Sequence, residues 1–504
     1  MDQQKRYVLI TRSSLGALDS SWQRPKKLEF DCDCACADDG FVPSGMTLPP
    51  PAPGTRFLSG SLFTARLTGD LHLAFDSRHR DLGVVVLNRP TRNLLQAFAS
   101  PRTLQEGADL VDKHPEALRT ARELVALGLL TPAGTTPTPS PFDNQPQTLT
   151  AWLHVSNQCN LRCDYCYVNK TPDEMELATG REAINAIFRS ATNNNFRKVK
   201  IKYAGGEASL NFPLVLALQQ HAQSLAAQHN LALDSVILSN GVAWSSRMIA
   251  ALKAHDLRLM ISLDGIGEFH DRQRQFSSGH GSFTHVERTL DRLAVAGVVP
   301  SISITVSNRN LAGLPQVLDY VLQRQLPFTL NFFRENECAV SFTDLTYQDE
   351  AIIAAMQAAF AVIEANLPPH SLLGALVDRA RLDTMHNRTC GVGQSYLVID
   401  QNGGIAKCHM EIEQTVTDIQ AADPLQLIRL DQVGIQNLPA EEKEGCRDCE
   451  WQYWCAGGCP ALTYRATGRF DIKSPNCRIY KALFPEVLRL EGLRLLKYSG
   501  IPVA

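Results

Sequence analysis

The cysteines are the residues of this sequence best suited to chemistry, and most of them are clustered. Of the 14 cysteines, three lie between positions 32 and 36, three lie at 159, 163 and 166, seven lie between 390 and 477, and Cys338 stands alone. Thiolates bind zinc and iron–sulfur clusters. Because the chain starts without a recognisable signal peptide, clustered cysteines indicate metal binding more than disulfides.

The stretch VSNQCNLRCDYCYVNK contains three cysteines in a C-x3-C-x2-C spacing, namely Cys159, Cys163 and Cys166. A 4Fe–4S cluster usually takes four thiolates, so three leave one iron free to bind a cofactor or substrate. A fragment of a zinc site, or three buried cysteines, is the simpler alternative for the triplet taken alone. Its position in the chain favours the cluster.

Alternating strand and helix patterns surround the triplet and continue to about residue 340. Six apolar strands separated by amphipathic helices predict six β/α units and a parallel sheet, three quarters of a barrel. Active sites of barrels lie at the carboxyl ends of the strands. The expected strands are AWLHVS (151–156), KVKIKYA (198–204), DSVILS (234–239), LRLMISL (257–263), VPSISITV (299–306) and PFTLNFF (327–333). The triplet and the motifs GGE, SNG and SLDG follow the first four of them.

The triplet, with Tyr165 as its aromatic residue, resembles the CX3CXΦC signature of radical S-adenosylmethionine (radical SAM) enzymes. That resemblance implies a 4Fe–4S cluster whose open iron chelates S-adenosylmethionine, and a 5′-deoxyadenosyl radical that abstracts a substrate hydrogen. The GGE of Gly205, Gly206 and Glu207 is similar to the motif that contacts the methionine amino group. SLDG and HDRQR resemble the segment that binds the carboxylate and ribose, which implies Ser262 and Arg274 as contacts.

The C-terminal cysteines follow a second pattern that is similar to the SPASM domain of radical SAM enzymes that modify peptides. The match includes seven cysteines and Gly403. A zinc ribbon is the alternative, but one four-cysteine zinc site would leave three cysteines over. The resemblance implies one auxiliary 4Fe–4S cluster on Cys390, Cys408 and Cys459 and a second on Cys446, Cys449, Cys455 and Cys477, three clusters in all.

The first auxiliary cluster lacks a fourth cysteine in the expected place, because residue 384 is threonine and no cysteine lies between 339 and 389. Its fourth position is therefore open, or it is filled by Cys338 or by one of Cys32, Cys34 and Cys36. We expect Cys338 to be a buried structural thiol. The segment that holds Cys32, Cys34 and Cys36 has either a ligand or lid role or none.

Residues 56–138 show three strands and then helices, which resembles the winged-helix RiPP recognition element that captures leader peptides as an added strand. A generic regulatory winged helix is the alternative. Proline-rich stretches at 48–53 and 131–148 predict linkers. The expected fold is α/β: a partial (β/α)6 barrel between an N-terminal winged-helix-like domain and a C-terminal iron–sulfur domain. The expected parts are an N-terminal segment (1–55), the leader domain (56–138), a linker (139–150), the barrel (151–340), a helical bridge (341–388) and the SPASM domain (389–504).

The composition of the chain limits the classes of partner that it is expected to bind. The 504-residue chain is 44% hydrophobic and 20% charged, with a formal net charge of -3. This balance argues against nucleic-acid binding, and no apolar run is long enough for a transmembrane helix. We expect a cytoplasmic protein whose partners are a precursor peptide and an electron donor such as flavodoxin or ferredoxin.

These features predict a maturase that binds a ribosomally made precursor by its leader and installs a thioether or carbon–carbon crosslink. One alternative is a dehydrogenase of the sulfatase-maturing type, which makes formylglycine. Another is a non-catalytic protein with structural clusters, against which the GGE and SLDG motifs argue. The catalytic base is open among Asp264, Asp271, Glu335 and Glu337.

Overall fold

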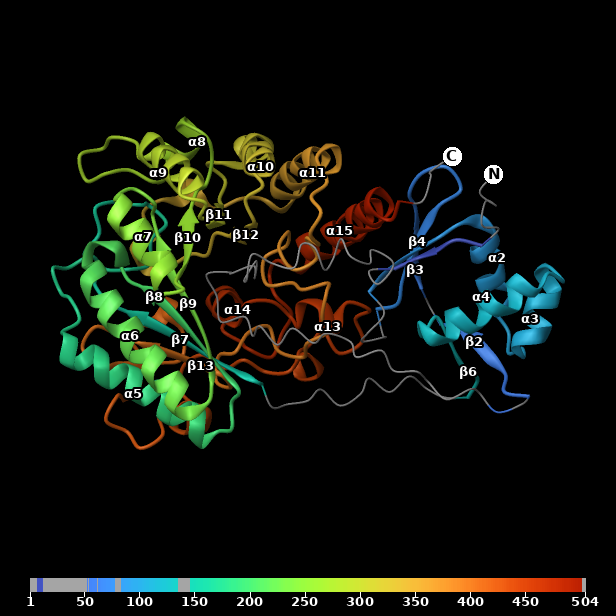
Figure 1. The fold of residues 1–504 in the computed structure, drawn as a ribbon, viewed down its shortest axis with the longest axis horizontal. Helices are drawn as coiled ribbons and strands as arrows, with labels where there is room; N and C mark the ends of the chain where they lie inside the picture. The colour runs from blue at the N-terminus through green and yellow to red at the C-terminus, as the bar shows by residue number, and fades with distance from the viewer. Residues whose placement is uncertain are drawn as a thin grey trace.

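The computed structural model describes residues 7–11, 52, 54–60, 62–77, 83–134 and 146–500. Two bodies stand side by side in Figure 1, a small front domain at the right and a larger barrel at the left. The segment with Cys32, Cys34 and Cys36 lies outside the described residues, as does most of the predicted linker. No helix of the described chain is long and apolar enough to cross a membrane.

The front domain is built on a four-stranded antiparallel sheet in the order β1-β5-β4-β3. Its strands are β1 (Leu9–Ile10), β3 (Phe63–Arg66), β4 (His72–Phe75) and β5 (Val84–Leu87). A separate pair joins β2 (Phe57–Ser59) to β6 (Leu130–Pro132). The helices are α2 (Arg89–Ala97), α3 (Leu104–Val111) and α4 (Pro115–Ala126). The sequence predicted the segments of β2 to β5 as strands and two of the helices, but neither the short α3 nor β6, whose residues it placed in a helix and a linker.

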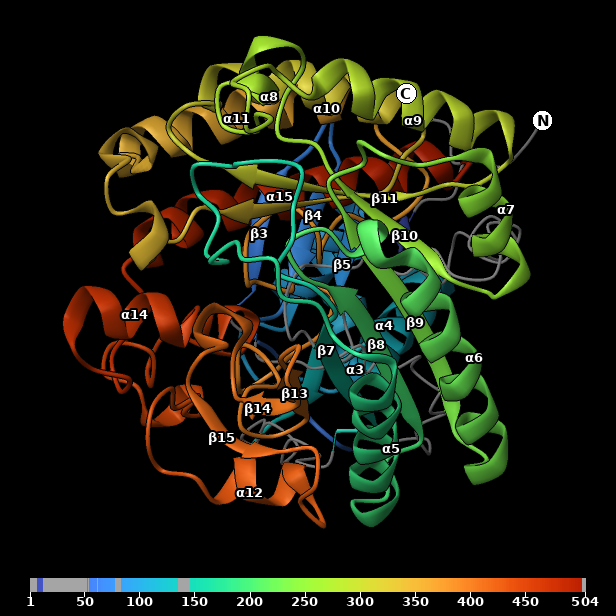
Figure 2. The ribbon, with the colours of Figure 1, turned by 90° about the vertical axis from the view of Figure 1, so that its left-hand side faces the viewer.

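The larger body contains six parallel strands that lie side by side in sequence order, as predicted. Between them run the helices α5 to α10, and α5, α6 and α7 cover the outer side of the sheet (Figures 1 and 2). The strands are β7 (Thr148–His154), β8 (Lys198–Ala204), β9 (Ala232–Ser239), β10 (Arg258–Ser262), β11 (Ser301–Val306) and β12 (Phe328–Phe332). The helices are α5 (Leu177–Asn193), α6 (Phe212–His229), α7 (Ser246–Ala254), α8 (Glu268–Asp271), α9 (Phe283–Val295) and α10 (Leu314–Gln323).

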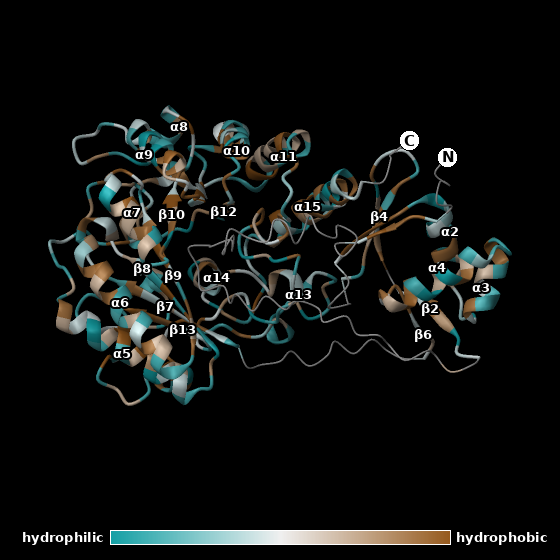
Figure 3. Ribbon diagram, viewed as in Figure 1, coloured by the Kyte–Doolittle hydropathy of each residue, from teal (hydrophilic) through white to brown (hydrophobic). Residues whose placement is uncertain are grey.

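The two faces of this sheet differ in chemistry because side chains alternate along a strand. Apolar residues of β7 and β8 such as Leu153 and Ile201 point outward into the main core with the helices. The helices carry both apolar and polar residues, as expected for a layer with one face in solvent (Figure 3). The alternate positions on the inner face include Lys200 and Lys202, which are buried and polar. A buried polar inner face is suited to binding rather than to packing alone.

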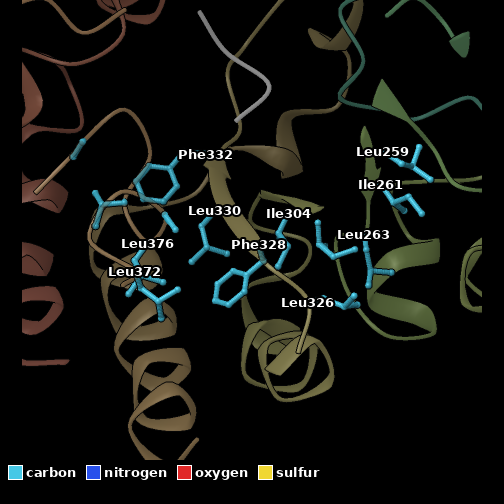
Figure 4. Close-up of a cluster of buried hydrophobic side chains, with 14 of the residues drawn as sticks. Leu259, Ile261, Leu263, Ile304, Leu326, Phe328, Leu330, Phe332, Leu372 and Leu376 are labelled. Atoms are coloured by element: carbon cyan, nitrogen blue, oxygen red, sulfur yellow. The ribbon is translucent and has the colours of Figure 1, made fainter. Parts of the chain in front are cut away.

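The chain after β12 covers the open edge of the barrel. The predicted helical bridge over 341–388 is helical mainly in α11 (Asp349–Ala365). The two prolines that follow, Pro368 and Pro369, stop the helix. The irregular segment beyond them packs Leu372 and Leu376 beside Phe328 and the rest of β12 (Figure 4), and the Leu330 N–H donates to the Ala375 carbonyl at 3.0 Å.

The C-terminal region continues the barrel sheet, which the sequence did not predict. Strand β13 (Tyr396–Ile399) runs parallel to β7, and β14 (Gly404–Ala406) and β15 (Thr415–Asp418) follow antiparallel. The short helices α12 (Pro424–Leu430), α13 (Gln452–Cys455) and α14 (Pro460–Thr467) precede the long α15 (Cys477–Tyr498). Helix α15 packs between α11 and the front-domain strands β4 and β5 (Figure 1), so it joins the two bodies.

Candidate active site

The loop that carries Cys159, Cys163 and Cys166 leaves the carboxyl end of β7 and is held from two sides. On one side, the Gly206 N–H donates to the Ser156 carbonyl at 2.7 Å and the Glu207 N–H donates to the Gln158 carbonyl at 2.8 Å. On the other side, the Arg162 N–H donates to the Gln275 carbonyl at 2.7 Å. The loops after β8 and β10 therefore position the triplet between them.

The two glycines of GGE are required by how closely these loops approach. A Cβ atom at Gly205 would lie 2.3 Å from the Ser156 carbonyl oxygen, and one at Gly206 would lie 2.3 Å from the Gln158 carbonyl oxygen. Gly205 also has a φ of +153°. Only glycine fits against another backbone at such distances. The GGE motif thus shapes the cysteine loop, a role that the sequence did not assign to it.

Glu207 is buried and links two strand ends. Its Oε1 accepts from the Ser239 hydroxyl at 2.7 Å and from the Ser209 N–H at 3.1 Å, and its Oε2 accepts from the Asn240 N–H at 2.6 Å. The Asn240 side chain donates to Asn160 Oδ1 at 2.7 Å and lies 3.9 Å from the Cys159 sulfur. The motif SNG was noticed in the sequence, but Asn240 was not assigned a role.

Tyr165, on the cysteine loop itself, forms a hydrogen-bonded network with the buried side chains of Asp264 and Arg274. The Tyr165 hydroxyl donates to Asp264 Oδ2 at 2.6 Å, and the Arg274 guanidinium contacts both partners, 3.4 Å from Asp264 Oδ2. Asp264 Oδ1 accepts from the Thr305 N–H at 2.8 Å. Arg274 is thus a structural neighbour of the triplet, and its Nε is buried with no hydrogen-bond partner among the described residues. Ser262 is the last residue of β10 and is partly exposed.

The donor set of the loop fits an iron–sulfur cluster. Burial raises the pKa of the Cys163 thiol to about 12, and the Arg274 charge opposes that shift. Such thiols bind as thiolates only when a metal displaces their protons. Among the described residues, no group of three or more His, Cys, Asp or Glu side chains is arranged to hold a single metal ion. A cuboidal cluster, which spreads its ligands over several irons, suits three such cysteines on one loop.

The seven C-terminal cysteines lie around two separate pockets. Cys390, Cys408 and Cys459 line the first, together with Arg379 and His409. Cys446, Cys449, Cys455 and Cys477 line the second, together with Trp451. The first pocket adjoins the inner face of the sheet, because its cysteines pack with Trp152 and Ala204. These are the two groups that the sequence pattern implied.

Cys338 is exposed, which corrects the expectation of a buried thiol. It lies in the short 3-10 helix Glu337–Ala339 that follows β12, and its sulfur lies 3.5 Å from the Tyr167 carbonyl oxygen. Of the four candidate bases, Asp264 makes the hydrogen bonds with Tyr165 and Thr305 described above. Asp271 accepts a hydrogen bond from the Phe283 N–H at 2.8 Å. Glu335 and Glu337 are exposed beside Cys338.

The model of the Radical SAM superfamily matches residues 153–320, which span the triplet, GGE and SLDG. Residues 153–320 of the chain therefore form a radical SAM domain. The triplet and the motifs around it are the residues that would hold a 4Fe–4S cluster and S-adenosylmethionine, and the chain is related to SPASM-type peptide maturases. The α/β fold with a partial barrel, an antiparallel N-terminal domain and a cysteine-rich C-terminal region is confirmed.

Two curated relatives illustrate the relationship. The sporulation killing factor maturation protein SkfB of Bacillus subtilis (strain 168) is 22% identical over 172 residues, 34% of this chain and 39% of that protein. A serine-type anaerobic sulfatase-maturating enzyme of Bacteroides thetaiotaomicron is 25% identical over 193 residues, 36% of this chain and 42% of that protein. The chain therefore spans about two fifths of the length of either relative.

A solved structure shares the fold. The structure of native anSMEcpe with bound AdoMet and Cp18Cys peptide superposes with a TM-score of 0.54 at 17% identity, covering 68% of this chain and 98% of that one. About a third of this chain thus has no counterpart in that structure.

Proposed function

We propose that this enzyme modifies a ribosomally made precursor peptide, which it binds by the leader and in which it installs a thioether or carbon–carbon crosslink. The observation that carries the proposal is the combination of one radical SAM site and two cysteine-lined pockets in one body with a docked antiparallel front domain. S-adenosylmethionine on its cluster supplies hydrogen-atom abstraction from unactivated carbon. The residues of the chain bind and orient the reactants.

The site residues divide into cluster ligands and cofactor contacts. We assign Cys159, Cys163 and Cys166 as the ligands of the first cluster. The cofactor contacts are the GGE backbone and Glu207, Tyr165, Ser262 and Arg274. We propose that the Glu207 carboxylate accepts a hydrogen bond from the methionine ammonium group. This bond would be added to the three that it already accepts, or would replace one of them. The buried Nε of Arg274 is available for a carboxylate or hydroxyl group.

We propose two auxiliary 4Fe–4S clusters, one in each C-terminal pocket. Cys390, Cys408 and Cys459 would hold the first, with one open iron. Cys446, Cys449, Cys455 and Cys477 would hold the second. These clusters would accept the electron that remains after a new bond forms, and a flavodoxin or ferredoxin would exchange electrons with the enzyme. This scheme requires three clusters in the loaded protein.

The front domain has a free strand edge that suits a leader peptide. Strand β3 is the last strand of its sheet in the described chain and alternates between partly buried and exposed residues. An extended peptide can add to such an edge through backbone hydrogen bonds. The same strands contact the second pocket, because Phe63 and Phe75 pack on Trp451 and the Trp454 indole N–H donates to the Ser77 carbonyl at 2.9 Å.

Co-expression with short reading frames that adjoin the gene, followed by mass spectrometry, tests the function. We expect a peptide that loses one pair of hydrogen atoms for each bond formed, and none from the Cys163→Ala variant. A peptide that is unchanged by the wild-type enzyme, while the cofactor is cleaved, would contradict the crosslinking proposal.

Proline substitutions along β3 test the leader edge. In an antiparallel edge strand the N–H groups of successive residues point alternately to the neighbour and to the open side. Proline at one of Thr64 and Ala65 should therefore weaken peptide binding with little loss of stability, and proline at the other should mainly destabilise the sheet. Equal peptide affinity in both variants would argue against strand addition at β3.

A sulfatase-maturing type of reaction is the second candidate, favoured by the relative and the solved structure reported above. It predicts oxidation of one cysteine or serine to formylglycine without a new crosslink. An aldehyde-reactive probe on the co-expressed peptide separates this product from a thioether or carbon–carbon bond.

A further inference from the structure

Arg379 is a cationic residue in the wall of the pocket that has only three cysteines. It lines this pocket with Cys390, Cys408 and Cys459. Two other polar side chains of the wall have partners within the protein. The Thr389 hydroxyl lies 2.7 Å from the Gly458 carbonyl oxygen, and the Tyr396 hydroxyl lies 3.2 Å from His409 Nδ1. Among the described residues, Arg379 differs from these groups because its Nε has no hydrogen-bond partner.

The Arg379 side chain is only 8% exposed, and its Nε is buried with no hydrogen-bond partner in the described part of the chain. The nearest carboxylate belongs to Asp378, whose Oδ1 lies 3.8 Å from that Nε, too far for a hydrogen bond. Both Asp378 oxygens instead accept from Arg334, at 2.7 and 2.5 Å. Among the residues that the structure describes, two buried guanidinium groups thus share one carboxylate, which leaves an excess positive charge beside the pocket. A buried charge of this kind normally has a partner.

The positive charge acts on the pocket itself. Arg334 and Arg379 both lie near Cys459, one of its three cysteines. The backbone of Arg379 is also held in the left-handed region, with φ +59°. This conformation is unfavourable for a residue with a long side chain, so the surrounding structure fixes it.

We propose that Arg379 makes the cysteine-free side of this pocket an anion-binding position that takes a carboxylate as the fourth ligand. The planar guanidinium fork matches a carboxylate through paired hydrogen bonds. The pocket adjoins the inner face of the barrel at Trp152, where a bound peptide would lie close to the radical SAM site. The carboxylate would come from an aspartate or glutamate side chain or from the C-terminus of the substrate peptide. This inference rests on the proposed auxiliary cluster and peptide substrate.

Electron paramagnetic resonance on a protein that lacks the first cluster tests the site. The Cys159→Ala/Cys163→Ala/Cys166→Ala variant is reconstituted, reduced and titrated with ¹³C-labelled acetate, with chloride at equal ionic strength as the control. We expect the spectrum of one cluster to change with acetate concentration until it saturates. Electron–nuclear double resonance should then detect a coupling between that cluster and the ¹³C nucleus of the bound acetate. Arg379→Gln in the same background should raise the half-saturating acetate concentration at least about tenfold, because the paired hydrogen bonds are lost. The half-saturating acetate concentration of Arg379→Lys should lie between that of the protein with Arg379 and that of Arg379→Gln.

Arg381→Gln is the matched control, since Arg381 is a neighbouring arginine that pairs with Asp383 at 3.3 Å. It should leave the titration unchanged. End-blocked Gly-Asp-Gly, its asparagine counterpart and Gly-Gly-Gly with a free C-terminus then identify which carboxylate binds. A response only to Gly-Asp-Gly indicates a side chain, and a response only to free Gly-Gly-Gly indicates a C-terminus.

Two results would overturn the inference, and they differ in what else they affect. If the variant holds about eight irons, as two 4Fe–4S clusters require, but acetate acts no differently from chloride or equally in Arg379→Gln, then Arg379 only balances the charge of the cluster. If the variant holds no iron, the auxiliary clusters themselves are contradicted, and the anion site falls with them.

Discussion

The carboxylate of Glu207, at the end of β8, accepts a hydrogen bond of 2.6 Å from the backbone N–H of Asn240, at the end of β9. Asn240 in turn reaches the cysteine loop through Asn160. Two neighbouring strand ends and the triplet are thus joined by one buried carboxylate. The GGE motif therefore supports the cysteine loop, in addition to the cofactor contact that we propose for it.

Glu207→Gln should weaken this connection. The amide replaces an acceptor by a donor that faces other donors, and an unsatisfied buried group costs about 1–3 kcal/mol. We expect a loss of that size in the free energy of unfolding, measured with urea, and weaker binding of S-adenosylmethionine. Glu268→Gln, at a side chain that is 87% exposed, should change neither.

Gly206→Ala should disrupt the cysteine loop, because its Cβ would lie 2.3 Å from one backbone oxygen and 2.5 Å from another. Backbone atoms cannot give way as a flexible side chain can. We expect the reconstituted variant to lose about four irons, one cluster. Gly374→Ala, whose Cβ meets nothing nearer than 3.4 Å, should keep its full iron content.

Asp264→Asn should be strongly destabilising, because it leaves the buried Arg274 guanidinium without its charged partner. Removal of one member of a buried ion pair costs about 3–5 kcal/mol. Chemical denaturation measures the loss. The exposed pair of Asp291 and Arg324 is the control, where Asp291→Asn should cost less than about 1 kcal/mol. Similar losses in the two variants would contradict the structural role given to Asp264.

Acid should destabilise the fold through His270, which is fully buried and neutral. Its Nδ1 accepts from the Asp264 N–H at 3.2 Å. Its Nε2 donates to the Ser282 hydroxyl oxygen, which itself donates to the Arg274 carbonyl at 2.8 Å. Burial, assisted by the Arg274 charge, lowers the His270 pKa well below its ordinary value.

The unfolded chain therefore binds a proton at this histidine before the folded chain does. Stability is complete above a pH of about 6.5 and is lost as the pH falls below that value. Urea midpoints measured from about pH 7.5 down to about pH 5 should fall less steeply in His270→Gln than in the wild type. If the urea midpoints of the two proteins fall equally steeply with pH, His270 does not take up a proton when the chain unfolds.

Local patterns predicted the barrel well because each strand and helix there has its own apolar period. The bounds of β8 were predicted correctly from the stretch KVKIKYA, because apolar residues that alternate over a few positions define a strand. The triplet, GGE and SLDG lie at strand ends as expected, because parallel strands bring their carboxyl ends to one edge.

Contacts between segments that are far apart in the sequence could not be predicted from such local patterns. The pairing of β13 with β7 joins Tyr396 to Thr150 across most of the barrel sequence. The position of Arg379 in the three-cysteine pocket depends on an irregular segment without periodicity. The docking of Phe75 on Trp451 depends on both bodies being folded. Tertiary packing determines these relationships, and no local propensity reports it.

Iron and acid-labile sulfide content after anaerobic reconstitution tests the central claim most directly. We predict about twelve irons in the wild type and about eight in the variant that lacks Cys159, Cys163 and Cys166, as one catalytic and two auxiliary 4Fe–4S clusters require. About four irons together with bound zinc in the wild type would contradict the account, because the C-terminal cysteines would then form a structural zinc module.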